Sequence, residues 1–165
     1  MSPDVNKRGH VLNAVLLTVG LGYVLEPSGS EATFVTIAEV SVPVVLGALL
    51  PDIDTAFGRH RKTLHNLLVL GVIAAYPVLF GNLQWVWIGV LTHYVLDVAG
   101  TTRGIALFYP VWDREFDLPV GLPVDSKWSD ALTVLITALE VAVIVGLVHF
   151  APPAVVDITS ELGLQ

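Results

Sequence analysis

The sequence predicts an all-α fold: an integral membrane bundle of about five transmembrane helices, with a polar site at its cytoplasmic face, in one domain covering residues 1–165. Hydrophobic residues make up 54% of the chain and charged residues only 14%, and the mean hydropathy is +0.73. This composition is too apolar for an ordinary soluble domain. The apolar residues also gather in five stretches, each close to the roughly 20 residues needed to cross a bilayer.

Turns rich in proline, glycine and charged residues separate the five stretches, which in chain order are 10–25, 33–50, 64–80, 83–99 and 131–150. The first is short and has no small-residue cleavage site, so we expect a retained helix rather than a signal peptide. The third contains Pro77, which a membrane helix tolerates when neighbouring groups satisfy the freed backbone carbonyl. Residues 100–129 form the only long loop, and long loops in compact domains often carry function.

The basic residues predict the orientation of the chain in the membrane. They occur before the first stretch, between the second and third, and between the fourth and fifth: Lys7, Arg8, Arg59, Arg61, Lys62, Arg103, Arg114 and Lys127. With five spans, these three regions lie on the same side. The other connections and the tail from residue 151 carry acidic residues or no charge. The positive-inside rule therefore places the N-terminus in the cytoplasm of a multi-pass cell-membrane protein.

The charge and the absence of cysteine narrow the chemistry. The net charge is −7, with 15 acidic residues against eight basic ones, which argues against a nucleic-acid partner because DNA binding needs a basic face. An acid-rich surface with little lysine fits a halophile. Without cysteine, any metal must be bound by histidine, aspartate, glutamate or asparagine. Phosphate-binding loops, nucleophile elbows and the HExxH helix are also absent.

On the predicted topology, seven ionisable residues fall near the cytoplasmic ends of the apolar stretches: His10, Asp52, Asp54, His60, His65, His93 and Asp97. Asp97 follows His93 by four residues, so both lie on one helix face, where they could bind one ion or form a simple helix-end hydrogen bond. Asp52 and Asp54 follow Pro51 at the end of a helix. Two carboxylates this close repel each other unless a cation lies between them, although a solvated acidic turn is the alternative.

The remaining polar residues leave more than one interpretation open. His60 fits a surface histidine in a basic loop better than a ligand. Arg61 and its basic neighbours suit topology or attraction to lipid headgroups, and an arginine that grips a phosphate is the sharper alternative. Glu39 and Glu140 lie within apolar stretches, where an unpaired carboxylate is costly. Glu140 could bond to a threonine or to groups around the metal.

The order of these residues resembles the YdjM-like family of membrane-bound, metal-dependent hydrolases. That family shows an early Gly-His, a LLPDID block, an HRGxTHS-type block and a GxLSHxxxD helix, followed by a Thr-Pro-Gly loop that ends in Trp-Pro or Tyr-Pro. The counterparts cover residues 9–123: Gly9-His10, Leu49 to Asp54, His60 to Asn66, Gly89 to Asp97, and Ala99 to Pro110. The third block departs from the pattern at Lys62 and at Leu64-His65-Asn66, and the fourth is followed by Gly100-Thr101-Thr102 instead of Thr-Pro.

The resemblance implies a metal site formed by His10, Asp52, Asp54, His65, His93 and Asp97. Because His60, Arg61 and His65 still align, the departures bear more on substrate positioning than on metal binding. A weaker similarity to zinc-dependent phospholipase C follows the same ligand order but lacks a later HxxxE pair and an N-terminal tryptophan ligand. One or two ions are therefore expected rather than three. Imidazole and carboxylate ligands suit zinc, with manganese or iron as alternatives.

The expected function is hydrolysis of a phosphoester or ester in an amphiphilic or lipid substrate at the cytoplasmic face of the membrane. Asp52 or Asp54 would act as bridging ligand or general base, and His60 or Arg61 would face the developing negative charge. Membrane lipid is the expected partner, and the oligomeric state stays open. The alternatives are a non-catalytic membrane scaffold or binding protein whose polar cluster is structural, and a small ion transporter that uses His93 and Asp97.

Overall fold

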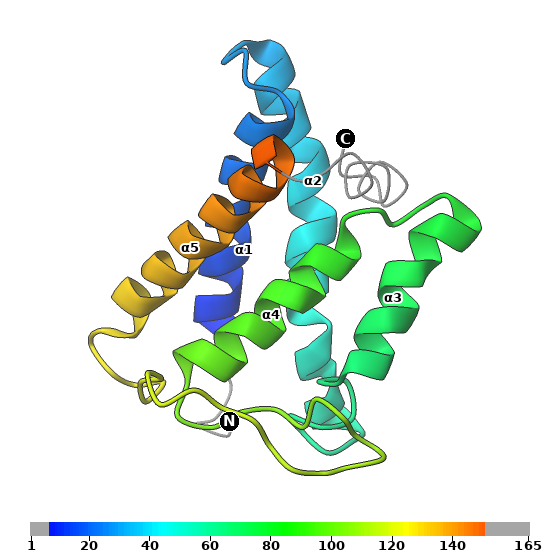
Figure 1. Ribbon diagram of the computed structural model, residues 1–165, viewed down its shortest axis with the longest axis vertical. Coiled ribbons are helices and arrows are strands. Elements are labelled where there is room, and N and C mark those ends of the chain that lie inside the picture. Colours follow the sequence, from blue (N-terminus) through cyan, green and yellow to red (C-terminus); the bar gives the residue numbers. More distant parts are fainter. Residues whose placement is uncertain (1–6, 151–165) are drawn as a thin grey trace.

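The computed structural model describes residues 7–150, which form five α-helices and one short 3-10 helix. Their order and limits are α1 (Lys7–Leu25), α2 (Glu31–Leu49), η1 (Pro51–Ala56), α3 (Leu67–Phe80), α4 (Val86–Gly100) and α5 (Ser129–Phe150). Figure 1 shows α1 and α2 as an antiparallel pair, with α5 lying across α1 and with α4 crossing to a separate α3. The expected all-α fold is therefore confirmed. The tail from residue 151, predicted to lie outside the cell, falls beyond the described residues.

Local sequence signals explain where several helices begin and end. Ser30 caps α2, and its side chain accepts a hydrogen bond from the backbone N–H of Ala32. Asn66 caps α3 in the same way, accepting from Val69 at 3.0 Å. Gly81 ends α3 with a φ of 67°, a left-handed conformation that glycine adopts without steric cost. The expected third stretch, 64–80, thus begins its helix only after the Asn66 cap.

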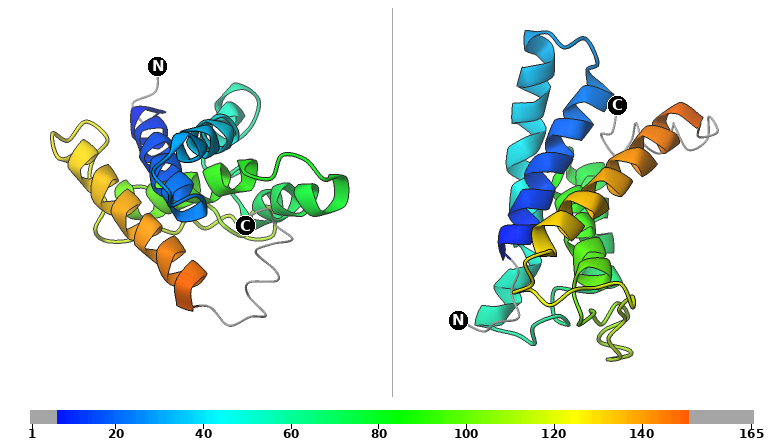
Figure 2. Two further views of the ribbon diagram at one scale, coloured as in Figure 1. Left: turned by 90° about the horizontal axis from the view of Figure 1, so that it is seen from above. Right: turned by 90° about the vertical axis from the view of Figure 1, so that its left-hand side faces the viewer.

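A close helix crossing joins α2 and α4. Gly47 and Gly89 face each other there, and a Cβ built on Gly89 would lie 2.6 Å from the backbone nitrogen of Ala48 and would collide with Val44 O. Around this crossing lies a core that α1, α2 and α4 share, which includes Leu17, Leu21, Val40, Val44 and Ile88. The close approach fixes α4 against α2 near the end of α2 that leads into η1 (Figure 2).

Three segments are long and apolar enough to cross a membrane: Lys7–Leu25, Glu31–Ala56 and Ser129–Phe150. The apolar helices α3 and α4 are shorter, with 14 and 15 residues. The structure therefore has the five expected helices, but three rather than five of them reach spanning length in the described part of the chain.

The long connection from α4 to α5 folds back under one end of the bundle (Figure 1). Backbone hydrogen bonds join Ile105 to Phe116 in both directions, and Ala106 donates to Arg61 O at 2.9 Å. The guanidinium of Arg103 makes two bonds to the carboxylate of Glu115, at 2.9 and 3.0 Å, and this contact lowers the pKa of Glu115. These bonds attach the loop to the turn that leads into α3.

Candidate metal centre

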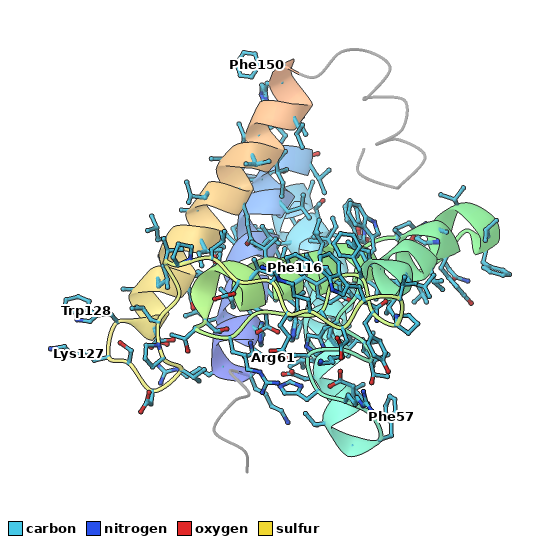
Figure 3. The ribbon with its side chains drawn as sticks, turned by 60° about the horizontal axis from the view of Figure 1, so that its bottom comes forward. Phe57, Arg61, Phe116, Lys127, Trp128 and Phe150 are labelled. Atoms are coloured by element: carbon cyan, nitrogen blue, oxygen red, sulfur yellow. The ribbon has the colours of Figure 1, made fainter. Side chains whose placement is uncertain are left out.

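The seven candidate residues come together at one end of the bundle, although they arise from four separate segments. His10 lies in the first turn of α1, Asp52 and Asp54 lie in η1, and His93 and Asp97 lie on α4. The turn between η1 and α3 contributes His60 and His65. All seven are buried except His60, which is partly exposed. Figure 3 looks onto this end, with Arg61 in the middle and Phe57 and Trp128 on opposite sides.

The three closest donor atoms are His65 Nε2, His93 Nε2 and Asp97 Oδ2. The two nitrogens lie 3.0 Å apart, and each lies 3.4 Å from the Asp97 oxygen. Donors on a tetrahedral zinc ion, with bonds near 2.1 Å, are separated by about 3.4 Å. The three atoms are therefore spaced as two imidazoles and one carboxylate around a single ion would be.

Hydrogen bonds on the far sides of the two rings place a hydrogen on each Nδ1 atom, so each ring in its neutral form presents a lone pair at Nε2. His93 Nδ1 lies 2.6 Å from Ala48 O, and because a carbonyl oxygen can only accept, Nδ1 must hold the hydrogen. His65 donates from Nδ1 to Asp54 Oδ2 at 3.0 Å. Burial lowers the pKa of His65, which favours its neutral form. At 3.0 Å the two Nε2 atoms need a shared proton or a metal ion between them, because two facing lone pairs repel each other.

Asp52 lies next to these three donors at a slightly larger distance. Its Oδ1 atom is 3.8 Å from His93 Nε2, 3.9 Å from His65 Nε2 and 4.0 Å from His60 Nδ1. Its other oxygen, Oδ2, is buried without a hydrogen-bond partner. A buried carboxylate oxygen without a partner is costly, so Asp52 is poised for a ligand that the protein itself does not provide.

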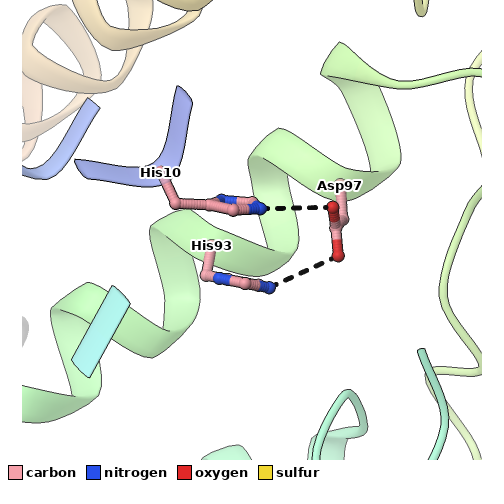
Figure 4. A group of neighbouring side chains, drawn as sticks. All are labelled: His10, His93 and Asp97. Carbon is pink, nitrogen blue, oxygen red and sulfur yellow. Dashed lines mark ion pairs between the residues drawn. The ribbon is translucent and has the colours of Figure 1, made fainter. Parts of the chain in front are cut away.

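His10 contacts both His93 and Asp97, as Figure 4 shows. Its ring stacks on that of His93, with centroids 3.7 Å apart, and its Nε2 atom lies 3.5 Å from Asp97 Oδ1. His10 and the nearer donors thus use different oxygens of the same carboxylate. This places His10 either beside a second ion or as the group that orients Asp97.

Asp54 uses both of its oxygens within the protein. Oδ1 accepts from His60 Nδ1 at 3.1 Å, and Oδ2 accepts from His65 Nδ1 and from the backbone N–H of Leu64. The carboxylate therefore orients two imidazole rings from behind, an arrangement common around metal-binding histidines. The expected roles of Asp54 as ligand and of His60 in catalysis stay predictions.

Arg61 is fully buried at the base of the site and adopts a φ of 65°. Its Nη1 atom donates to Thr101 Oγ1 at 3.1 Å and to the carbonyl of Arg103. Nη2 lies 3.7 Å from Asp97 Oδ1. A non-glycine residue at positive φ is strained, and such strain gathers at functional sites. The guanidinium here joins the α4–α5 loop to the Asp97 carboxylate.

Two groups of residues satisfy the spacing of a metal site: His10 with His93 and Asp97, and Asp52 with His60 and His65. The contact between His65 and His93 joins the two groups into one continuous cluster. Two buried carboxylate oxygens without hydrogen-bond partners, two facing imidazole nitrogens and a nitrogen–oxygen donor set all fit a divalent cation. The residues could therefore hold one metal ion or two adjacent ions.

Sequence reasoning missed several groups that orient the site. Ala48 O fixes the His93 ring, Thr101 receives the Arg61 side chain, and the Tyr94 hydroxyl donates to Leu64 O next to His65. A backbone carbonyl carries no sequence signal. Tyr94 could have been found, because it adjoins His93 in the HxxxD helix, on a neighbouring face.

The two carboxylates left open by the sequence lie away from the centre. Glu140 Oε2 accepts from Asn13 Nδ2 at 2.6 Å, and the same amide donates to Thr137 Oγ1. Glu140 therefore joins α5 to α1 through Asn13, while Thr137 is a second partner of that amide. Glu39 is exposed on the outer surface of α2, so it takes no part in the cluster.

Comparison with known protein families places the chain. The family model of the YdjM inner membrane protein matches residues 6–156. The chain belongs to the YdjM inner membrane protein family. This confirms the resemblance seen in the four motif blocks and supports a membrane location. Searches of curated proteins and of solved structures gave no match. The description of the site in this YdjM family member therefore rests on its own sequence and structure.

Proposed function

We propose that this chain is a membrane-bound, metal-dependent hydrolase. The observation that carries the proposal is the group of three buried donors, His65 Nε2, His93 Nε2 and Asp97 Oδ2. Beside them lies the Asp52 carboxylate, whose Oδ2 atom has no hydrogen-bond partner. Catalytic zinc sites use three protein ligands and leave a position for water or substrate, whereas structural sites are closed by four. Two imidazoles and one carboxylate correspond to the catalytic type.

The donor set favours zinc. Two neutral imidazole nitrogens and a carboxylate, with no thiolate, suit this ion, and manganese or iron are the alternatives. When bound, the ion supplies Lewis acidity, polarising a phosphoryl or acyl oxygen and lowering the pKa of a coordinated water towards neutrality. Asp54 and Ala48 O hold the two rings so that both Nε2 atoms point inward.

The chain supplies its own acid–base groups beside these ligands. Asp52 Oδ2 is buried and has no partner, so it can accept a proton from an attacking water. Asp54 cannot do this as readily, because both of its oxygens already accept hydrogen bonds. His60 Nε2 is also without a partner, so this ring is the group that we expect to exchange a proton with the leaving group.

We infer that the substrate is amphiphilic, a lipid phosphoester or ester cleaved near the membrane surface. The ligands lie at the ends of apolar helices, where they would face lipid headgroups rather than acyl chains. The distribution of basic residues supports a cytoplasmic location for that surface, by the positive-inside rule. A water-soluble substrate would not require ligands gathered at the boundary of a bilayer.

The first test is metal content, measured by elemental analysis of protein purified without metal-affinity chromatography. Wild type is expected to retain near-stoichiometric zinc or manganese, and the His93→Ala, Asp97→Ala double variant is expected to lose it while staying helical. The loaded protein is then screened against phosphoesters and lipid esters, with Asp52→Asn as the variant that retains metal and loses turnover. A folded wild type that binds no metal after resupply would instead support a scaffold with a structural polar cluster.

A further inference from the structure

An aromatic cluster lies on the α4–α5 loop beside the metal centre. Phe108, Trp112 and Phe116 contact one another, with ring centroids 5.5 to 6.2 Å apart. The Arg114 guanidinium lies over two of these rings, 5.8 Å from the Trp112 centroid and 5.6 Å from the Phe116 centroid. We call these four residues, together with Val111, the aromatic loop patch.

Most of the apolar side chains of the patch are exposed rather than buried. Val111 is 95% exposed, and Trp112 and Phe108 are each about half exposed, at 48% and 47%. A cation stacked on aromatic rings gives the patch an apolar body and a charged edge, the combination found where side chains meet lipid headgroups.

The patch is attached firmly to the metal-site turn rather than hanging on a free loop. Phe116 pairs with the fully buried Ile105 through two backbone hydrogen bonds, and the next residue, Ala106, donates to Arg61 O. The Arg61 side chain returns to the same loop through Thr101 and the carbonyl of Arg103. These hydrogen bonds therefore fix the aromatic rings relative to the Asp97 carboxylate.

The position of the patch relative to the helices indicates what it contacts. The loop lies at the end of the molecule where α1 and α5 begin and where α2 runs into η1 (Figures 1 and 3). These three segments reach membrane-spanning length, so one surface of the bilayer passes through this end. Trp128, at the start of α5, repeats the same chemistry, with Lys127 Nζ 5.6 Å from its ring centroid.

We propose that the aromatic loop patch inserts into the headgroup layer of the bilayer and fixes the depth of the metal centre. Tryptophan is enriched at this layer, and arginine places its apolar stem against apolar groups while its charged end stays in the headgroup region. The consequence for substrate class rests on the proposed function: a centre held at headgroup depth acts on bonds at that depth, which selects lipids whose scissile ester lies in the headgroup region.

The test is fluorescence quenching of a protein in which Trp112 is the sole tryptophan, with Trp85, Trp87 and Trp128 replaced by phenylalanine. The protein is reconstituted in phosphatidylcholine vesicles with or without lipids that carry a nitroxide on the headgroup. The nitroxide lipid is expected to quench Trp112 strongly, whereas iodide in water quenches it weakly. Strong iodide quenching without lipid quenching would overturn the proposal and leave the patch as a surface for a protein partner.

A pair of charge variants in the same single-tryptophan protein provides the matched control. Val111→Asp places a charge in the patch and is expected to reduce lipid quenching of Trp112, whereas Thr102→Asp places it on an exposed loop position outside the patch and should leave quenching unchanged. Equal effects of the two substitutions would contradict insertion. The readout requires neither metal nor substrate, so failure of the hydrolase proposal would not alter it.

Discussion

At the scale of single residues, the structure separates the two aspartates that the sequence presents as equals. Asp52 keeps one buried oxygen without a partner, while both oxygens of Asp54 accept hydrogen bonds from His60 and His65. The two aspartates are separated by one residue in the 3-10 helix η1, so their side chains point to different sides. Asp52 therefore faces the donors, and Asp54 faces the backs of the imidazole rings.

This division predicts different metal affinities for variants of the site. Asp54→Ala is expected to weaken metal binding about 10- to 100-fold, the usual cost of losing a group that orients a histidine ligand. His93→Ala should abolish stoichiometric binding, because it removes a ligand. The affinities are measured by competition with a chromophoric chelator at fixed pH.

Asp54→Asn provides the control for folding in this series. The amide retains one acceptor oxygen and nearly the same volume, so the affinity of this variant should fall between those of wild type and Asp54→Ala. If Asp54→Ala lost all metal, as His93→Ala does, Asp54 would be a ligand. If all three Asp54 proteins bound equally, the residue would have no role in the site.

The residues of the cluster could be predicted from the sequence. Which of them face the centre and which orient the others could not. The order of histidines and aspartates along the chain indicated His65, His93 and Asp97, because their spacing brings polar groups to one end of a bundle. The fixing of His93 by Ala48 O depends on how α2 crosses α4. Such a contact between backbone and ring follows only from tertiary packing, which motif spacing does not encode.

At the scale of helices, the crossing of α2 and α4 sets the position of His93. Gly47 and Gly89 let the two backbones approach closely, and the Ala48 carbonyl next to Gly47 accepts the bond from His93, one turn after Gly89. Small residues at a helix contact are typical of membrane bundles, where van der Waals packing replaces the hydrophobic effect. The position of His93 in the candidate site therefore depends on the glycine contact.

Gly89→Ala is expected to separate the two helices and disturb the site. A Cβ at this position would collide with Val44 O and lie 2.6 Å from Ala48 N, both backbone atoms that cannot move aside independently. Overpacking of this kind typically costs about 1–3 kcal/mol, and the loss of the His93–Ala48 bond should lower metal affinity as well. Unfolding by denaturing detergent measures the first effect, and chelator competition measures the second.

Gly71→Ala in α3 is the matched control. Nothing lies within 4 Å of a Cβ built on Gly71, so this substitution should leave metal binding unchanged. It should also stabilise the helix by about 0.5–1 kcal/mol, because alanine loses less conformational freedom than glycine. A Gly89→Ala protein as stable and as metal-competent as Gly71→Ala would show that the crossing tolerates separation.

The helices themselves were well indicated by hydropathy, and their ends by capping residues. Apolar stretches located all five helices, because burial in lipid demands continuous apolar sequence. The third helix starts later than its stretch, since Asn66 caps it and the Tyr94 hydroxyl holds the preceding turn. The path of the α4–α5 loop could not be foreseen, because it depends on bonds from Arg61 to residues some 40 positions away.

At the scale of the whole molecule, the shorter helices raise the question of what crosses the bilayer. α3 has 14 residues, which is about 21 Å at 1.5 Å per residue, whereas the hydrocarbon core is about 30 Å thick. Figures 1 and 2 show the α3–α4 turn standing apart from the α1–α2 turn. Both helices of this hairpin have their other ends at the metal centre. A hairpin that enters and returns leaves the sidedness of the remaining chain unchanged.

Single cysteines report this arrangement, because the chain has none of its own. With a membrane-impermeant maleimide on sealed cells, Ser28→Cys in the α1–α2 turn is expected to react, and Thr102→Cys beside the metal centre only after permeabilisation, as the positive-inside rule requires. Asn82→Cys in the α3–α4 turn should resist labelling until detergent is added, because α3 is too short to reach the far surface. Labelling of Asn82→Cys on sealed cells would make α3 and α4 full spans. Labelling of Thr102→Cys there would move the metal centre to the outer face and exclude a cytoplasmic substrate.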